Sequence, residues 1–338
     1  EFEGNDNYDI QELQSLRSTY AFMNQNEDHA LSDKALRQAL LRGLDKETYC
    51  NTLLEGGATA GKAPVPPTLD FGFDDLKDEN SYDPDSAKKI LDEAGYKDVD
   101  GDGFVETPDG DPLVLDFVIY TSRAELGVYA QAAQASLKEI GINVNLNTVS
   151  YETLLDMRDS GQYDLLIWSV LVANTGDPEN YLRENWYSSS ANNTAGYNNP
   201  EVDKLLDELA QTFDEDKRKD LIIDIQQDIM DDAATVFFGY ETTYLFSNKK
   251  VTGVKLKAKT NTTLTFFWTS QAYAEYYNIY KYDSKKGKYV KVGTTAGNVN
   301  TFKVRGLPEG SYFRFKITAV VGGNEGARSE PYKVVTNP

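Results

Sequence analysis

The first half of the chain alternates between two spacings of apolar residues. Residues 112–120, 143–149 and 163–170 form apolar runs with strand character, while residues 126–140 and 151–160 have helical spacing. The resulting order of strand, helix, strand, helix and strand is typical of an α/β fold.

The segment ahead of these strands is predicted to contain a strand at residues 18–25 and several helices. One or two amphipathic helices are expected after Ser32, a suitable N-cap. Their apolar positions are Leu36, Leu40, Leu44, Tyr49 and Leu53. A further helix is predicted from Asp83, its cap, to Gly95, which ends it.

Two segments are not expected to form regular elements. Residues 58–79 contain Pro64, Pro66 and Pro67 and are predicted to form a long ordered excursion. Residues 1–14 are acidic and polar and are interpreted as a tail or linker.

The pattern changes near Lys249. Before it, helices beginning at Pro200 and Asp216 and one or two strands over residues 235–246 complete the α/β pattern. After it, seven short alternating runs rich in β-branched and aromatic residues predict a β-sandwich. We therefore expect a tail at residues 1–14, an α/β domain at residues 15–248 and a β domain at residues 249–338.

Charge divides the chain in the same way. The net charge is −20, but residues 249–338 carry 16 basic and 5 acidic residues, a net of +11, and the first 248 residues carry −31. The acidic part should repel nucleic acid and anionic membranes. The basic part is predicted either to touch an anionic surface or to be an ordinary solvated face.

Composition excludes several kinds of chemistry. The single Cys50 and the single His29 exclude a disulfide framework, cysteine-based zinc sites and histidine-rich metal sites. No carboxylate pair is singled out by its spacing, so the chain is not expected to be an enzyme. No apolar run reaches the roughly 18 residues of a membrane span.

An acidic loop at residues 98–109 (DVDGDGFVETPD) has partial calcium-loop spacing. The ligands expected from this pattern are Asp98, Asp100, Asp102, the carbonyl of Phe104, Glu106 and Asp109. The alternative is a turn in which the aspartates bond to the loop backbone. Any calcium would be structural, and no other cofactor is expected.

The candidate ligand site follows the strand at residues 163–170. Ligands of α/β sheets bind beyond the carboxyl ends of strands, where Trp168 could line an apolar pocket and Asn174 and Asp177 could supply polar contacts. Alternatively, Trp168 is a core residue and Asp177 starts a helix. Arg123 could pair with a ligand carboxylate, or be a solvated first-turn residue, and Tyr120 is assigned to the same site.

Five ordered segments resemble the extracellular solute-binding proteins of ABC importers, in the class that binds peptides or nickel. The segment at residues 82–96, YDPDSAKKILDEAGY, is similar to the family pattern YDPEKAKKLLAEAGY. The other four are at residues 35–47, 141–146, 163–178 and 196–206. The resemblance covers the carboxyl-terminal portion of such proteins, so we expect one lobe plus a short return segment.

This resemblance implies a type II periplasmic-binding-protein-like lobe with a mixed sheet and flanking helices. It also implies capture of a solute, most often an oligopeptide, between two lobes that then dock on a membrane permease. In peptide binders a carboxylate at the position of Asn174 commonly meets the ligand's amino terminus, and some place a carboxylate-pairing arginine at the position of Arg123. The chain is expected to be monomeric, extracellular and anchored through a lipidated amino terminus outside this sequence.

The basic β domain resembles a fibronectin type III domain, an immunoglobulin-like sandwich. The resemblance rests on Trp268, Tyr277, Ile279, Tyr280 and the segment Tyr312–Ile317, which it implies are core residues. Leu307 and Tyr312 resemble a tyrosine-corner pair. The alternative to transport is therefore a cell-surface scaffold that uses this domain to contact polysaccharide or cell wall.

Overall fold

The computed structural model describes residues 8–173, 175–248 and 250–338. The chain divides into two compact units. The larger unit is Gln14–Thr243, and the smaller unit joins Glu1–Leu13 to Tyr244–Pro338. Each unit contains its own cluster of buried apolar side chains.

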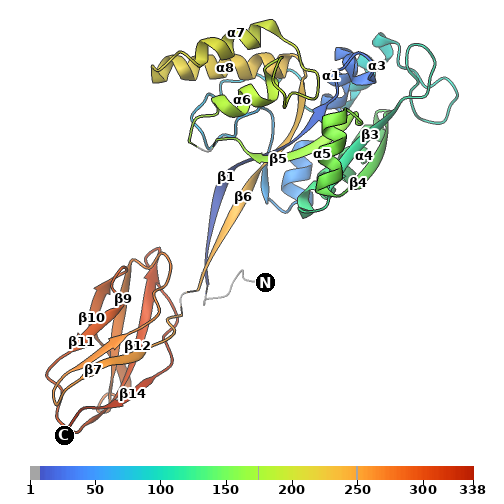
Figure 1. Cartoon of the computed structure of the whole chain (residues 1–338). Coiled ribbons are helices and arrows are strands. Elements are labelled where there is room, and N and C mark those ends of the chain that lie inside the picture. Colours follow the sequence, from blue (N-terminus) through green and yellow to red (C-terminus); the bar gives the residue numbers. More distant parts are fainter. Residues whose placement is uncertain (1–7, 174, 249) are drawn as a thin grey trace. The chain divides into compact units, whose positions relative to one another are not determined.

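A six-stranded mixed sheet forms the centre of the larger unit, with strand order β2-β6-β1-β5-β3-β4 (Figure 1). Strand β3 runs parallel to β4 and β5, while β1 runs antiparallel to β5 and β2 antiparallel to β6. The strands are β1 Tyr8–Met23, β2 Ala58–Ala60, β3 Val114–Tyr120, β4 Asn143–Val149, β5 Leu165–Leu171 and β6 Thr235–Asn248.

Helices pack around this sheet. They are α1 Lys34–Arg42, α2 Lys46–Thr48, α3 Pro84–Ala94, α4 Ala124–Glu139, α5 Tyr151–Ser160, α6 Glu179–Trp186, α7 Pro200–Leu209 and α8 Glu215–Asp231. Helix α1 packs on α3, α4 packs on β3 and β4, and α7 packs on both α6 and α8 (Figure 1). Short 3₁₀ and π turns lie at Ala30–Ser32 and Tyr49–Leu53.

The structure corrects three expectations from the sequence, and it contains a helix that the sequence indicated as one of two alternatives. Residues 8–14 are not an irregular tail but the start of β1, and residues 58–60 of the proline-rich excursion form β2. Asp33, not Ser32, caps α1, because its carboxylate accepts a hydrogen bond from the Ala35 amide. Helix α6 was expected only as an alternative.

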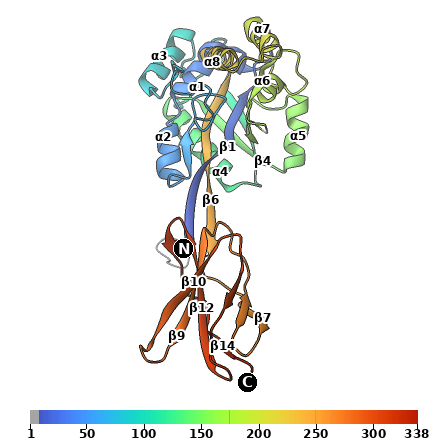
Figure 2. The ribbon, with the colours of Figure 1, turned by 90° about the vertical axis from the view of Figure 1, so that its left-hand side faces the viewer.

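The smaller unit contains two antiparallel sheets. One has the order β10-β9-β12, with β13 and β14 both paired to β12, and the other has the order β11-β8-β7 (Figure 2). The strands are β7 Lys255–Lys259, β8 Leu264–Phe267, β9 Tyr276–Asp283, β10 Lys288–Ala296, β11 Thr301–Val304, β12 Tyr312–Val321, β13 Asn324–Glu325 and β14 Tyr332–Val335.

Alternate residues of these strands form the core of the smaller unit. Trp268, Tyr277, Phe315 and Ile317 are all buried, as the resemblance implied. Tyr312 is different, because its side chain is 56% exposed. The prediction that Tyr312 is a core residue was therefore wrong: it lies on the outer face of β12.

No helix in the described part of the chain is long and apolar enough to cross a membrane.

Candidate functional site

A cavity of about 380 Å³ in the larger unit lies beside the end of β5. Trp168 of β5 and Asp177, ahead of α6, both line it. The parallel strands β3 and β5 end at the same edge of the sheet, where α/β proteins bind ligands. The cavity therefore brings together two of the residues that the sequence singled out.

An aromatic row connects Tyr120 to this cavity. Tyr120 packs edge-on against Tyr151, with ring centroids 5.4 Å apart, and Tyr151 stacks on Trp168 at 6.1 Å. The guanidinium of Arg158 lies 5.2 Å from the centre of the Trp168 ring. Trp168 is therefore held between two neighbours, which fixes its orientation at the cavity wall.

Asp177 is already neutralised by a cation. Its Oδ2 accepts hydrogen bonds from Nε and Nη2 of Arg218 at 3.0 and 2.8 Å, and Glu179 bonds to the same guanidinium at 2.9 Å. Burial would lower the pKa of Arg218, but these carboxylates outweigh it and raise the pKa. This arrangement fixes the start of α6 and leaves Asp177 little free charge for a ligand.

Glu184 of α6 provides the available negative charge at the cavity. Its carboxylate accepts a hydrogen bond from Asn180 Nδ2 at 2.9 Å, and no cation of the described chain lies within ion-pair distance of it. Asn180, Asn185 and Asn192 add amides that can both donate and accept. The site thus combines aromatic surface, amides and one unpaired carboxylate.

The sequence reasoning missed Glu184, Asn180, Asn185, Arg158 and Tyr151. None of them belongs to a recognisable motif. The available signal was the polar face of an expected helix after Pro178, and only the fold turns that face toward Trp168. Asn174, which was expected to contact the ligand, lies outside the described residues.

Arg123 lies at a different place, a second cavity of about 240 Å³. Its guanidinium is 2.6 Å from Glu125 and 2.5 Å from Glu241. Burial would lower its pKa, but the bonds to Glu125 and Glu241 outweigh this effect and raise it. The structure does not bring Arg123 together with Trp168, and two carboxylates of the protein already occupy it.

The acidic loop brings Asp98, Asp100 and Asp102 within 4.8 Å of one another on the surface. Asp98 accepts hydrogen bonds from the amides of Gly101 and Gly103, and Asp102 accepts one from Phe104. A hard cation could be held by these oxygens. Asp109 is outside the group found among the described residues, and the aspartates already satisfy the loop backbone.

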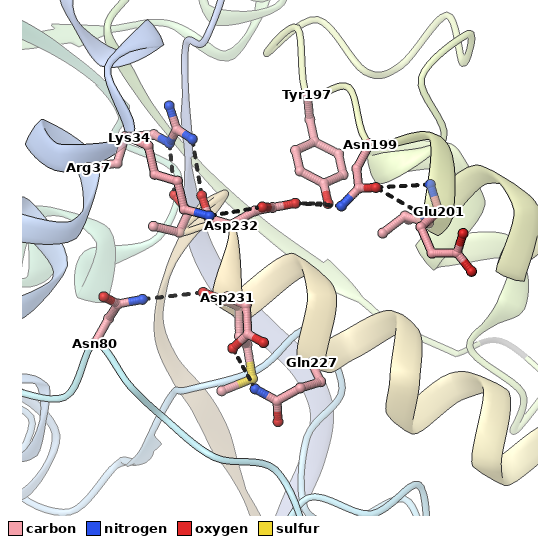
Figure 3. A network of polar contacts seen from close by, with 12 residues as sticks. Lys34, Arg37, Asn80, Tyr197, Asn199, Glu201, Gln227, Asp231 and Asp232 are labelled. Atoms are coloured by element: carbon pink, nitrogen blue, oxygen red, sulfur yellow. Dashed lines mark hydrogen bonds and ion pairs between the residues drawn. The ribbon is translucent and has the colours of Figure 1, made fainter.

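Several residues of the recognised segments form a structural network rather than a ligand site (Figure 3). Asp232, at the end of α8, accepts hydrogen bonds from the Tyr197 hydroxyl at 2.9 Å and from Asn199 Nδ2 at 2.7 Å. It also pairs with Lys34 at 3.1 Å, while Arg37 donates to the backbone carbonyls of residues 232 and 233. The network joins α1, α7 and α8.

A mixed sheet with flanking helices and a cavity at the strand ends defines a lobe of the type II periplasmic-binding-protein-like class. The family model of bacterial extracellular solute-binding proteins, family 5 Middle, matches residues 1–193, and the fibronectin type III model matches residues 249–335. The chain therefore belongs to the family 5 bacterial extracellular solute-binding proteins and carries a fibronectin type III domain. This family binds solutes and is not a family of enzymes.

Curated relatives match over part of their length. The probable D,D-dipeptide-binding periplasmic protein DdpA of Escherichia coli (strain K12) is 29% identical over 246 residues, which are 72% of this chain and 45% of DdpA. The periplasmic oligopeptide-binding protein OppA of Salmonella typhimurium is also 29% identical, over 64% of this chain and 38% of OppA. The chain thus spans less than half the length of these relatives.

Solved structures show the same fold. The oligopeptide-binding protein AppA from Bacillus subtilis, in complex with a nonapeptide, superposes with a TM-score of 0.65 at 24% identity, covering 75% of this chain and 50% of AppA. A mannohexaose-bound oligopeptide-binding protein from Thermotoga maritima gives 0.61 at 26% identity, covering 70% and 46%.

Proposed function

We propose that the larger unit is the carboxyl-terminal lobe of a solute-binding receptor that serves a bacterial ABC importer, and that its solute is an oligopeptide. The observation that carries this proposal is the 380 Å³ cavity at the end of β5, which is lined by both Trp168 and Glu184. The peptide ligands named for DdpA, OppA and AppA support the same class of solute.

Each part of the cavity suits one part of a peptide. Glu184 can pair with the ligand's ammonium, the role that a carboxylate at the position of Asn174 would otherwise take. The amides of Asn180, Asn185 and Asn192 can bond to peptide N–H and C=O groups. Trp168 offers aromatic surface to side chains, with Tyr151 and Tyr120 behind it.

The remaining residues of the original hypothesis take supporting roles in this proposal. Asp177 fixes the start of α6 through Arg218, and Asn174 stays a proposed ligand contact. Arg123 acts at the second cavity through Glu241 rather than on the peptide. The acidic loop is proposed as a surface turn that can take up calcium.

The proposed setting follows from the family. The lobe closes on its solute together with a second lobe, and the closed receptor docks on the permease in the membrane. We propose that the receptor is a monomer outside the cell, held at the surface by a lipidated amino terminus.

Peptide binding is tested by isothermal titration of the chain with a trialanine and with the same peptide acetylated at its amino terminus. We expect the free peptide to bind and acetylation to weaken binding, because the ammonium that Glu184 pairs with is lost. Glu184→Gln should raise the Kd of the free peptide about tenfold, so that the free and the acetylated peptide bind with similar affinity. Glu208→Gln on α7 is the matched control.

Trp168→Ala should weaken both peptides, since it removes aromatic surface rather than charge. Binding of mannohexaose with no binding of either peptide would replace the peptide proposal by an oligosaccharide one. Equal binding by the Glu184 and Glu208 variants would show that the ammonium is held elsewhere.

A further inference from the structure

The strand register of the smaller unit places a set of basic and aromatic side chains on one outer face of a sheet. In β9 and β12 the odd-numbered residues Tyr277, Ile279, Phe315 and Ile317 are buried in the core. Even-numbered residues point to the opposite face of the sheet, where Asn278, Tyr280 and Thr318 are covered by neighbouring side chains and Tyr282, Arg314 and Lys316 are partly exposed. This face belongs to the sheet formed by β10, β9, β12 and β14 (Figure 2).

Two rows of side chains cross this outer face from strand to strand. In one row Tyr289 lies opposite Tyr282, and Arg314 lies opposite Lys333. In the next row Lys291 and Lys316 lie on either side of Tyr280. We call the cations Lys291, Arg314, Lys316, Arg328 and Lys333, with the rings Tyr280, Tyr282 and Tyr289, the basic face.

Aromatic rings hold three of these cations in place. The guanidinium carbon of Arg314 lies 3.7 Å from the centre of the Tyr282 ring, and that of Arg328 lies 4.6 Å from the centre of the Tyr280 ring. The Lys316 ammonium lies 5.3 Å from the centre of the Tyr289 ring. A cation on a ring is ordered without losing its charge, so less entropy is lost when it meets an anion.

Carboxylates do not neutralise the basic face. Among the described residues, none of its five cations has an acidic side chain within 4.0 Å. Glu325 accepts hydrogen bonds from Asn278, Tyr280 and Thr318, which together with the charge of Lys291 lower its pKa, so these neighbours already occupy its carboxylate. The face is therefore a preorganised cationic surface.

Apolar surface lies at the edge of the same face. Tyr312 is 56% exposed and Val335, opposite it in β14, is 45% exposed. Tyr312 is two residues from Arg314 on β12, so both side chains point outward. An occupant of this surface must offer anionic groups next to ring faces or other apolar patches.

We propose that the basic face binds an acidic polysaccharide, one whose sugar units carry carboxylates. The carboxylates would pair with the cations and the sugar rings would lie against Tyr312 and Val335. This inference concerns the smaller unit alone and does not depend on the proposed peptide site.

The side chains next to the cations favour a glycan over other polyanions. Residues 249–338 carry a net charge of +11, which attracts any polyanion, so the choice rests on the exposed apolar side chains beside the cations. Sugar rings alternate apolar faces with anionic groups at short spacing, which matches the mixture of cations and exposed apolar side chains. Nucleic acid and acidic protein are outcomes of the test.

The experiment measures binding of the full 338-residue chain to polygalacturonate by isothermal titration at low and moderate salt. Dextran serves as the neutral polysaccharide, and duplex DNA and polyglutamate serve as other polyanions. We expect polygalacturonate to bind, more weakly as salt rises, and dextran not to bind. DNA and polyglutamate should bind at least about tenfold more weakly.

Two variants with equal charge changes locate the site. Arg314→Gln/Lys316→Gln/Lys333→Gln removes three cations of the basic face and should raise the Kd for polygalacturonate about tenfold or more. Lys255→Gln/Lys257→Gln/Lys259→Gln removes three exposed lysines of β7 in the other sheet and should change the Kd less than about twofold. Tyr282→Leu keeps the net charge but removes the ring under Arg314, and should also weaken binding. Circular dichroism confirms that each variant is folded.

Three results would overturn the proposal. The first is no binding of polygalacturonate at low salt. The second is an equal loss of affinity for polygalacturonate in the β7 variant, which would show that binding depends on net charge and not on the basic face. The third is equal or tighter binding of DNA or polyglutamate, which would assign the face to another class of polyanion.

Discussion

The carboxylate of Asp232 contacts residues from two of the segments that resemble the family or lie next to them. It receives hydrogen bonds from Tyr197 and Asn199, whose sequence neighbourhood resembles the family, and it pairs with Lys34 beside α1 (Figure 3). Burial and the charge of Asp232 both raise the pKa of Tyr197, which keeps its hydroxyl a donor. These residues preserve the packing of three helices.

Replacing Asp232 with alanine should therefore destabilise the larger unit by about 2 kcal/mol. The substitution leaves the Tyr197 hydroxyl and the Asn199 amide without their acceptor in a partly buried place. Urea denaturation followed by circular dichroism measures the effect. Asp231→Ala is the matched control, because Asp231 is exposed and its side chain accepts a hydrogen bond from the partly exposed Gln227, and should change stability by less than about 0.5 kcal/mol.

Glu325 gives the smaller unit a dependence on pH. Burial would raise its pKa, but hydrogen bonds from Thr318, Tyr280 and Asn278 outweigh burial and hold the pKa below the ordinary 4.5. A carboxylate with a lowered folded-state pKa stabilises the fold above pH 4.5 and loses this effect as the pH falls through the folded-state pKa.

Glu325→Gln should accordingly lower the stability of the smaller unit by about 1 kcal/mol at pH 7, where the ionised acceptor is lost. The difference from the unmodified protein should shrink toward pH 3, where Glu325 is itself becoming protonated. Thermal denaturation at both pH values measures it. A constant difference would contradict the assignment, and Glu330→Gln on the exposed surface is the control.

Close packing of β6 against neighbouring elements depends on one glycine. A Cβ atom added to Gly239 would lie 2.3 Å from the Tyr129 hydroxyl, 3.0 Å from Cys50 Sγ and 3.1 Å from the Thr59 carbonyl. Tyr129 belongs to α4 and Thr59 to β2, and Tyr129 is fully buried. The missing side chain therefore allows three elements to meet.

Gly239→Ala should destabilise the larger unit by about 1–3 kcal/mol, since the added methyl group overlaps the Tyr129 hydroxyl and crowds the Thr59 backbone carbonyl. Gly127→Ala is the opposite case, because a Cβ there meets nothing within 4 Å and Gly127 is the fourth residue of α4. That substitution should stabilise the unit by about 0.5–1 kcal/mol through helix propensity. Chemical denaturation of both variants measures the two changes in the free energy of unfolding, which should have opposite signs.

Element prediction succeeded where local chemistry specifies the boundary. Asp83 caps α3, Pro84 occupies its first turn and Gly95 ends it in the left-handed conformation, as the sequence indicated. It failed where a segment has no local signal. Residues 8–14 and 58–60 become strands because neighbouring strands supply their hydrogen-bond partners, and such pairing is not encoded in short polar runs.

At the scale of the whole molecule, two separate cores predict two unfolding events. Leu206 is fully buried in the core of the larger unit, and Phe315 is fully buried in that of the smaller unit. Calorimetry should resolve two transitions. Leu206→Ala should lower the midpoint temperature of one transition and Phe315→Ala that of the other. Each substitution should reduce the free energy of unfolding of its own unit by about 2–5 kcal/mol. A single transition shifted by both variants would contradict this prediction.

The candidate site was only partly visible in the sequence. Trp168 and Asp177 line one cavity beside the end of β5, and their role in ligand binding stays a prediction; they could be singled out because strand ends are local features. The pairing of Arg123 with Glu241, 118 residues away, could not be predicted from the sequence. The orientation of the polar face of α6 toward Trp168 could not be predicted from it either. Charge partners of this kind are chosen by the fold.

The sequence by itself determined the two-part composition, most helix boundaries, the strand order along the chain and the relation to a family. Each of these depends on residues close together in the chain or on ordered local segments. Only the tertiary structure decided which charges remain unpaired: Asp177 and Arg123 are neutralised, while Glu184 and the cations of the basic face are not. Long-range packing selects the partner of each charged side chain, and an unpaired charge next to aromatic surface is what a ligand can recognise.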